Sequence, residues 1–107
     1  MERIYLDHAA TTPARPEAVQ AMLPHFTAGG YNPSSPHAEG RTARAALDCA
    51  RESLARGLNA KPKEIVFTGG GSEADNLAIL GAAEAAQDRG RHIVSTRFEH
   101  HAVLHAL

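Results

Sequence analysis

The sequence predicts an α/β fold in which a mostly parallel sheet is covered by helices. Two apolar runs of β-type residues, 64–68 and 92–96, each lead into a segment with helical spacing. A strand-helix-strand-helix order gives parallel strands, whose faces helices must cover. Two strands are too few for such a sheet, and the printed sequence stops within the apolar pattern at Leu107. We therefore expect a truncated part of a larger domain.

The first part of the chain is predicted to be mainly helical. Residues 3–7 are a predicted short strand, and the proline and threonines of 8–13 indicate an ordered loop. Pro16 suits the first turn of a helix, whose apolar stripe extends to Phe26. We expect the methionine and phenylalanine of this stripe to make core contacts. Turn-forming residues then fill 29–36.

A long helix is predicted next. Ser35 followed by Pro36 is a typical helix start, and Gly57 or Asn59 is a typical end signal. The helix should therefore extend to about Leu58. Its apolar stripe has helical spacing and consists of Ala43, Ala46, Leu47, Ala50, Leu54 and Leu58.

Strands and helices alternate in the remaining segments. After the strand at 64–68, a glycine turn leads into an alanine-rich helix that should end near Asp88, where Gly90 closes it. The strand at 92–96 follows. A final helix should begin at Glu99 and continue past the end of the printed sequence.

Composition and charge exclude several classes of protein. The chain has 107 residues, of which 43% are hydrophobic and 21% are charged, as in a globular domain and unlike a disordered one. Its net charge of −1, with both signs interspersed, provides no basic surface for nucleic acid or an anionic membrane. One cysteine excludes an internal disulfide framework and suits a reducing cytoplasm. No apolar run approaches the length of a membrane span.

The segment from Gly69 to Asn76 indicates a phosphate site. Glycines let the backbone approach an anion, and the start of a helix adds a partial positive charge. Ser72 supplies a hydroxyl at the same place. A purely structural interpretation stays open, in which the glycines form a tight turn and Ser72 caps the helix.

Two named nucleotide loops compete for these glycines. A P-loop requires a lysine before its hydroxyl residue, whereas Gly71 is followed directly by Ser72. The dinucleotide fingerprint is matched in spacing by Gly69, Gly71 and Ala74. Glu99 would then be the candidate ribose ligand. A Rossmann-type dinucleotide-binding enzyme is therefore the alternative, although its motif usually lies at the start of a domain.

Four motifs follow one another along the chain: Tyr5–Pro13, Asn32–His37, Glu64–Asn76 and Glu99–Leu104. In this order they resemble the opening third of a cysteine desulfurase, within the class V aminotransferase group of pyridoxal-phosphate enzymes. The resemblance implies the type I, aspartate-aminotransferase-like fold and a homodimer. It also implies that residues 1–60 are the N-terminal arm and helices of the small domain and dimer interface. Residues 61–107 would begin the cofactor-binding large domain, which is truncated.

The resemblance also implies a reaction and a cofactor. Enzymes of this family convert L-cysteine to L-alanine and transfer the sulfur as a persulfide to an acceptor or scaffold protein, for iron-sulfur cluster or thio-cofactor synthesis. Pyridoxal 5'-phosphate would be held through its phosphate by the backbone at Gly71 and by Ser72, where many relatives have threonine. His100 matches the histidine that stacks on the cofactor ring and moves protons. Without the resemblance, His100 would more often be a solvent-facing or helix-capping residue.

A metal site is the less favoured interpretation of the other histidines near the end. His101 and His105 lie four apart on a predicted helix, with Glu99 nearby. Ala102, however, stands where the zinc-protease motif has its glutamate. We therefore expect these histidines to lie on an exposed helix surface and to bind no metal.

Two groups that the family reaction requires are missing. The only lysines, Lys61 and Lys63, lie in a predicted exposed turn without the family's lysine motif, and Cys49 is expected to be a packing residue beside an apolar stripe. The resemblance places His8 near the active site and His37 near the dimer interface, and neither receives a catalytic role. We expect the chain alone to be inactive. An inactive binding fragment and another class V aminotransferase remain alternatives.

Overall fold

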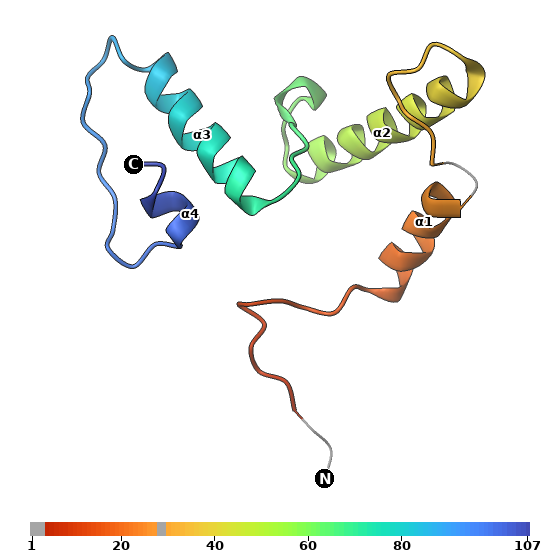
Figure 1. The fold of residues 1–107 in the computed structure, drawn as a ribbon, viewed down its shortest axis with the longest axis horizontal. Helices are drawn as coiled ribbons and strands as arrows, with labels where there is room; N and C mark the ends of the chain where they lie inside the picture. The colour runs from red at the N-terminus through yellow and green to blue at the C-terminus, as the bar shows by residue number, and fades with distance from the viewer. Residues whose placement is uncertain (1–3, 28–29) are drawn as a thin grey trace. The chain divides into compact units, whose positions relative to one another are not determined.

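The computed structural model describes residues 4–27 and 30–107, and the chain divides into two compact units, Met1–Ile65 and Val66–Leu107. All regular structure in the described residues is helical, as Figure 1 shows. None of these helices is long and apolar enough to cross a membrane. In chain order they are α1 (Pro16–Thr27), α2 (Ala38–Gly57), the 3₁₀ helix η1 (Pro62–Glu64), α3 (Gly71–Ala85) and α4 (His101–Leu104).

The strands predicted from the sequence do not form in the described residues. Glu64 belongs to η1, and residues 65–68 and 92–96 have neither helix nor strand pairing. Residue 3 lies outside the described residues, and 4–7 form no strand either. A strand needs a neighbour that satisfies its N–H and carbonyl groups, and among residues 4–27 and 30–107 no extended segment pairs with these runs. The parallel sheet is therefore not confirmed.

α1 confirms the helix predicted to begin at Pro16. Near its other end, the Thr27 hydroxyl donates to the Leu23 carbonyl at 3.2 Å. The expectation of core contacts is wrong, because Phe26 is 73% exposed and Met22 is also exposed. An apolar stripe is buried only where another surface covers it, and the described residues of the first unit leave these side chains exposed.

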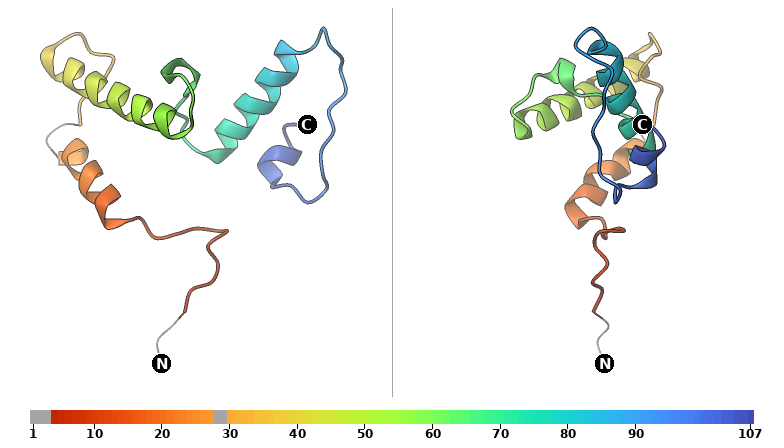
Figure 2. Two further views of the ribbon diagram at one scale, coloured as in Figure 1. Left: turned by 180° about the vertical axis from the view of Figure 1, so that it is seen from behind. Right: turned by 90° about the vertical axis from the view of Figure 1, so that its left-hand side faces the viewer.

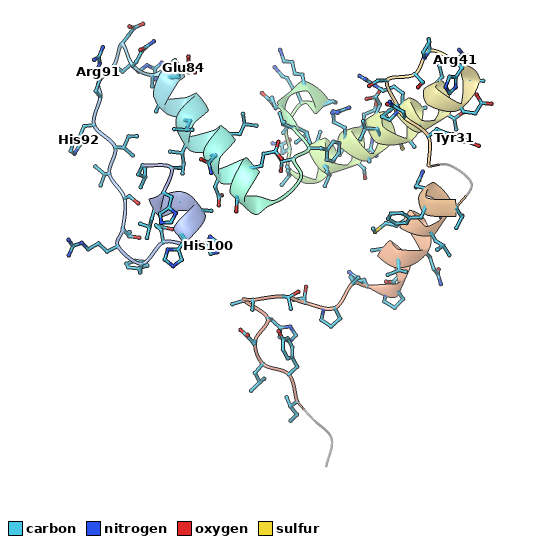
Figure 3. All side chains as sticks on the ribbon, in the orientation of Figure 1. Tyr31, Arg41, Glu84, Arg91, His92 and His100 are labelled. Atoms are coloured by element: carbon cyan, nitrogen blue, oxygen red, sulfur yellow. The ribbon has the colours of Figure 1, made fainter. Side chains whose placement is uncertain are left out.

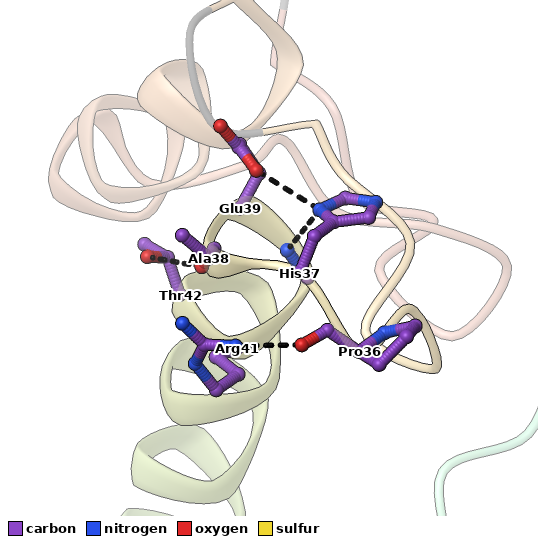
Figure 4. A network of polar contacts seen from close by, with 7 residues as sticks. Pro36, His37, Ala38, Glu39, Arg41 and Thr42 are labelled. Carbon is purple, nitrogen blue, oxygen red and sulfur yellow. Dashed lines mark hydrogen bonds and ion pairs between the residues drawn. The ribbon is translucent and has the colours of Figure 1, made fainter.

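α2 begins at Ala38, later than the start predicted at Ser35–Pro36. His37 is the N-cap residue instead, because its backbone is extended and its Nδ1 accepts the Gly40 N–H at 3.3 Å. The same nitrogen lies 2.9 Å from a carboxylate oxygen of Glu39 (Figure 4). His37, which the resemblance placed near the dimer interface without a catalytic role, therefore fixes the start of this helix.

The loop before α2 passes very close to the first turn of the helix at Gly40. Gly40 is buried, and a Cβ built there would lie 2.7 Å from the Cβ and 2.8 Å from the carbonyl carbon of Ser35. Only glycine allows such an approach. Arg41 ties the loop to the same turn, since its Nη1 donates to the Pro36 carbonyl at 2.6 Å (Figure 4).

The end of α2 confirms the end signal predicted from the sequence. The helix ends at Gly57, and Asn59 has a positive φ of 52°. The Asn59 N–H donates to the Arg56 carbonyl at 3.3 Å, and the Ala60 N–H donates to the Ala55 carbonyl at 2.8 Å. These two bonds form the Schellman arrangement, which satisfies the last carbonyls of a helix. Ala55 itself is only 1% exposed.

In the second unit, α3 ends at Ala85, before the limit predicted near Asp88. A turn follows in which the Arg89 N–H donates to the Ala86 carbonyl at 2.8 Å, and Gly90 has a φ of 152°, which favours glycine. α4 packs on α3 (Figure 2). The prediction of a longer final helix is wrong, since α4 is a single turn. A helix of one turn is only marginally stable, because it forms few hydrogen bonds for the number of residues whose backbone it fixes.

Candidate functional site

The glycine turn leads into α3 through Gly70, which is the N-cap residue. Gly70 is fully extended, with φ 171° and ψ 174°. The first helical bond joins the Ala74 N–H to the Gly70 carbonyl at 3.1 Å. The N–H groups of Gly71, Ser72 and Glu73 come before this bond, and the start of a helix leaves such groups without helical acceptors. They are the donors that an anion at this position would use.

Ser72 lies within the first turn of α3, so the interpretation of Ser72 as the N-cap is wrong. Its carbonyl accepts a hydrogen bond from Asn76 Nδ2 at 2.8 Å. Its hydroxyl makes no hydrogen bond to any residue that the structure describes, and the residue is exposed. The hydroxyl is therefore free to add one more donor to the backbone set.

The space above the turn is open to solvent. A Cβ built at Gly70 or Gly71 would meet no atom within 4 Å. A bulky anion can therefore reach the backbone, and several N–H groups and a hydroxyl at the positive end of a helix suit a phosphate monoester. The residues present fit the phosphate of the cofactor that the resemblance implies.

Glu73 belongs to the same turn, although none of the motifs above singled it out. Its Oε2 accepts the Gly69 N–H at 2.7 Å. From the other direction, the Thr68 hydroxyl donates to the Gly70 carbonyl at 3.2 Å. A glutamate at the third helical position would accept the N–H of the N-cap residue Gly70 in a capping box, whereas Glu73 reaches one residue further, to Gly69, so the sequence carried no specific signal for this bond.

His100 is the N-cap residue of α4, not part of a helix that begins at Glu99 as predicted. Its Nδ1 accepts the Ala102 N–H at 3.1 Å, and the side chain is exposed (Figure 3). In the neutral ring this bond leaves the proton on Nε2. His100 and Ser72 lie in the same unit, but no hydrogen bond joins them in the described part of the chain. The structure therefore confirms the capping role and leaves the stacking role a prediction.

The family described as Aminotransferase class-V matches residues 4–107. The chain belongs to the class V aminotransferase family. This membership replaces the Rossmann-type alternative, which required the same glycines to form the first turn of a dinucleotide-binding domain.

Curated relatives of this class V aminotransferase chain match almost all of it. "Putative cysteine desulfurase IscS 1" of Bacillus subtilis (strain 168) is 55% identical over 105 residues, and the alignment covers 98% of this chain and 28% of the relative. "Cysteine desulfurase IscS" of Methanosarcina thermophila is 50% identical over 102 residues, which are 95% of this chain and 25% of the relative. The protein of the same name from Clostridium botulinum (strain Hall) is 47% identical over 104 residues, which are 97% of this chain and 26% of the relative. The chain thus spans about a quarter of the length of these relatives.

The lysines and the cysteine lie apart from the glycine turn in sequence and belong to the first unit. Lys61 precedes η1, where its backbone N–H donates to a carboxylate oxygen of Glu64 at 2.7 Å. Lys63 lies within η1. Cys49 is exposed on α2, so the expectation that it packs in a core is wrong. The stripe beside it is itself only partly covered within this unit.

The histidines of α4 form no larger ligand cluster. The ring centroids of His101 and His105 are 5.6 Å apart. Glu99 points to another partner, since its Oε1 accepts the Thr96 hydroxyl at 2.7 Å. Across 4–27 and 30–107, no group of three or more His, Cys, Asp or Glu side chains could hold a metal ion.

A hollow of about 910 Å³ in the second unit has neither the glycine turn nor His100 in its lining. It is lined mainly by apolar side chains of α3 and of the segment that follows it. Val94 on this segment is 85% exposed. The hollow is an uncovered apolar surface, and the lining includes Ala78, Ile79, Ala82, Ile93, Val103 and Leu107.

Proposed function

We propose that this chain is the N-terminal part of a pyridoxal-phosphate-dependent cysteine desulfurase, which converts L-cysteine to L-alanine and transfers the sulfur as a persulfide. The observation that carries the proposal is the match to relatives named cysteine desulfurase over 94% or more of the chain. The open glycine turn supports it, because a phosphorylated cofactor needs such a donor set.

The residues of the turn would bind the cofactor through its phosphate. The backbone N–H groups at Gly71 and Ser72 would donate to phosphate oxygens, and the Ser72 hydroxyl would add a charge-assisted bond. His100 would place its ring against the cofactor ring and hold a proton on Nε2. The cofactor, when bound, supplies the electron sink for the breakdown of cysteine.

The complete reaction would need groups from outside these 107 residues. The lysine that holds the cofactor and the cysteine that accepts the sulfur would come from the other three quarters of the relatives' length. We also propose a homodimer, an acceptor or scaffold protein for the sulfur and, given the single cysteine, a reducing cytoplasmic location.

The same proposal includes the type I fold. Residues 64–68 and 92–96 would become strands once further segments satisfy their backbone groups. Residues 1–60 would then belong to the small domain and dimer interface, and residues 61–107 would begin the large domain.

A chimera tests the proposed function. Residues 1–107 replace the aligned segment of the Methanosarcina thermophila relative, and production of L-alanine and of sulfide is measured with L-cysteine, cofactor and a thiol reductant. We expect a rate close to that of the unmodified relative, which is the control. A chimera that folds and binds the cofactor but leaves L-cysteine unchanged would contradict the proposal.

A further inference from the structure

Glu73 is linked across the glycine turn to a backbone group that precedes its own helix. Its carboxylate oxygen lies 2.7 Å from the Gly69 nitrogen and accepts that N–H. A Cβ at Gly69 would lie 3.2 Å from the same oxygen, which is tighter than ordinary contact. The absence of a side chain at Gly69 therefore helps the carboxylate to reach the backbone.

This bond closes a ring around the residues that would bind phosphate. The ring runs from Gly69 through Gly71 and Ser72 to Glu73, and the Thr68 hydroxyl holds the Gly70 carbonyl within it at 3.2 Å. A glycine-rich segment has much conformational freedom to lose, so two side-chain bonds that order it also order the N–H groups on it. The turn is thus held in shape by its own side chains.

The hydrogen bond of the Glu73 carboxylate orders the turn for phosphate binding, whereas its negative charge opposes phosphate binding. A glutamate in the first turn is stabilised by the positive end of α3. A phosphate dianion would use the same positive end, and two negative groups near each other repel. Both groups would be exposed to solvent, so salt should screen this repulsion.

We propose that Glu73 is a positioning residue of the phosphate site: its carboxylate orders the glycine turn, and its negative charge lowers the affinity of the turn for a phosphate dianion. The inference rests on the proposed function, because it takes the turn to be the place where the cofactor phosphate binds. An uncharged residue that accepted the same Gly69 N–H would also order the turn, but it would not change the affinity for phosphate through charge.

The test uses the chimera described above, isotope-labelled, freed of cofactor and titrated with inorganic phosphate at low ionic strength, because the 107-residue chain alone is not expected to fold cooperatively. Backbone amide signals of 69–72 report binding and hydrogen exchange at the turn itself. Glu73→Gln keeps an oxygen that can accept the Gly69 N–H and removes the charge, so phosphate should bind about fivefold tighter. This gain should disappear at high salt.

Two further variants separate order from charge. Glu73→Ala removes both the bond and the charge, so hydrogen exchange at Gly69 should be about three- to tenfold faster, and phosphate should bind more weakly than to Glu73→Gln. Glu84→Gln is the matched control, because Glu84 lies near the other end of the same helix (Figure 3). Its phosphate affinity should stay within about twofold of the wild-type chain.

Each result decides between the statements. Equal phosphate affinity of the wild type and Glu73→Gln, or an equal gain from Glu84→Gln, would overturn the role of the Glu73 charge. Unchanged exchange at Gly69 in Glu73→Ala would overturn the ordering role. If no chain bound phosphate at the turn, the phosphate site itself would be wrong, and the inference with it.

Discussion

Replacing Gly40 by alanine tests how tightly the loop before α2 packs on the helix. Gly40 lies in the first turn of α2 and is buried against Ser35. Helix propensity predicts that the substitution stabilises α2, because alanine favours a helix over glycine by about 1 kcal/mol. Packing against Ser35 predicts instead that the substitution destabilises the start of α2.

The distances around Gly40 indicate that packing prevails. A new Cβ would lie 2.7 Å and 2.8 Å from two carbon atoms of Ser35 and closer still to the Ser35 carbonyl oxygen, whereas ordinary contact begins at 3.4 Å, so the loop would have to retreat by more than about 0.7 Å. The bond between Arg41 and the Pro36 carbonyl resists this movement. Overpacking of this kind costs about 1 to 3 kcal/mol, so we expect a net loss of about 1 kcal/mol after the gain in propensity.

Amide hydrogen exchange along α2, followed in the chimera, measures the effect, and Gly57→Ala is the control on the same helix. A Cβ at Gly57 would meet no atom within 4 Å, so this variant should show the gain in propensity alone, up to about 1 kcal/mol. Exchange in the first turns of α2 should be faster in Gly40→Ala and slower or unchanged in Gly57→Ala. Slower exchange in Gly40→Ala would refute the packing argument.

Three further predictions concern the site. In the chimera, Ser72→Ala should weaken binding of pyridoxal phosphate by about 1.5 to 3 kcal/mol in an absorbance titration, and unchanged affinity would remove the hydroxyl from the site. His100→Ala in the same chimera should slow alanine formation by about 10²- to 10⁴-fold while leaving the circular dichroism spectrum unchanged; a normal rate would leave only the capping role. The 107-residue chain alone should release no sulfide from cysteine and should unfold without a cooperative transition. Borohydride treatment with the cofactor, followed by intact mass measurement, tests this expectation. A stoichiometric cofactor adduct on Lys61 or Lys63 together with desulfurase activity would contradict it.

Local signals in the sequence predicted the helix limits with uneven success. The end of α2 was predicted correctly, because Asn59 tolerates the positive φ that the Schellman bonds require. Its start was predicted too early, at Ser35 followed by Pro36, because the side chain of His37 accepts the capping bond. Histidine is not among the usual capping residues, so its side chain gave no signal.

The candidate site was predicted in part. The three glycines and Ser72 indicated an open turn with free donors, and the structure has that turn at the start of α3. The Glu73 bond to Gly69 was not predicted, because the capping-box spacing points to the N–H of the N-cap residue Gly70. The role of His100 at the cofactor came only from the resemblance, since an exposed histidine at a helix cap has no sequence pattern specific to catalysis.

The sequence by itself determined the features that depend on residues a few positions apart: the end of α2, the glycine turn and the donors at the start of α3. Such features need only local hydrogen bonds and backbone preferences. The tertiary structure decided whether the apolar run at 92–96 pairs as a strand and whether the stripes of α1 and α2 are buried. Pairing and burial both require surfaces from segments distant in the chain, and in these two units the run stays unpaired and Phe26, Leu54 and Val94 stay exposed.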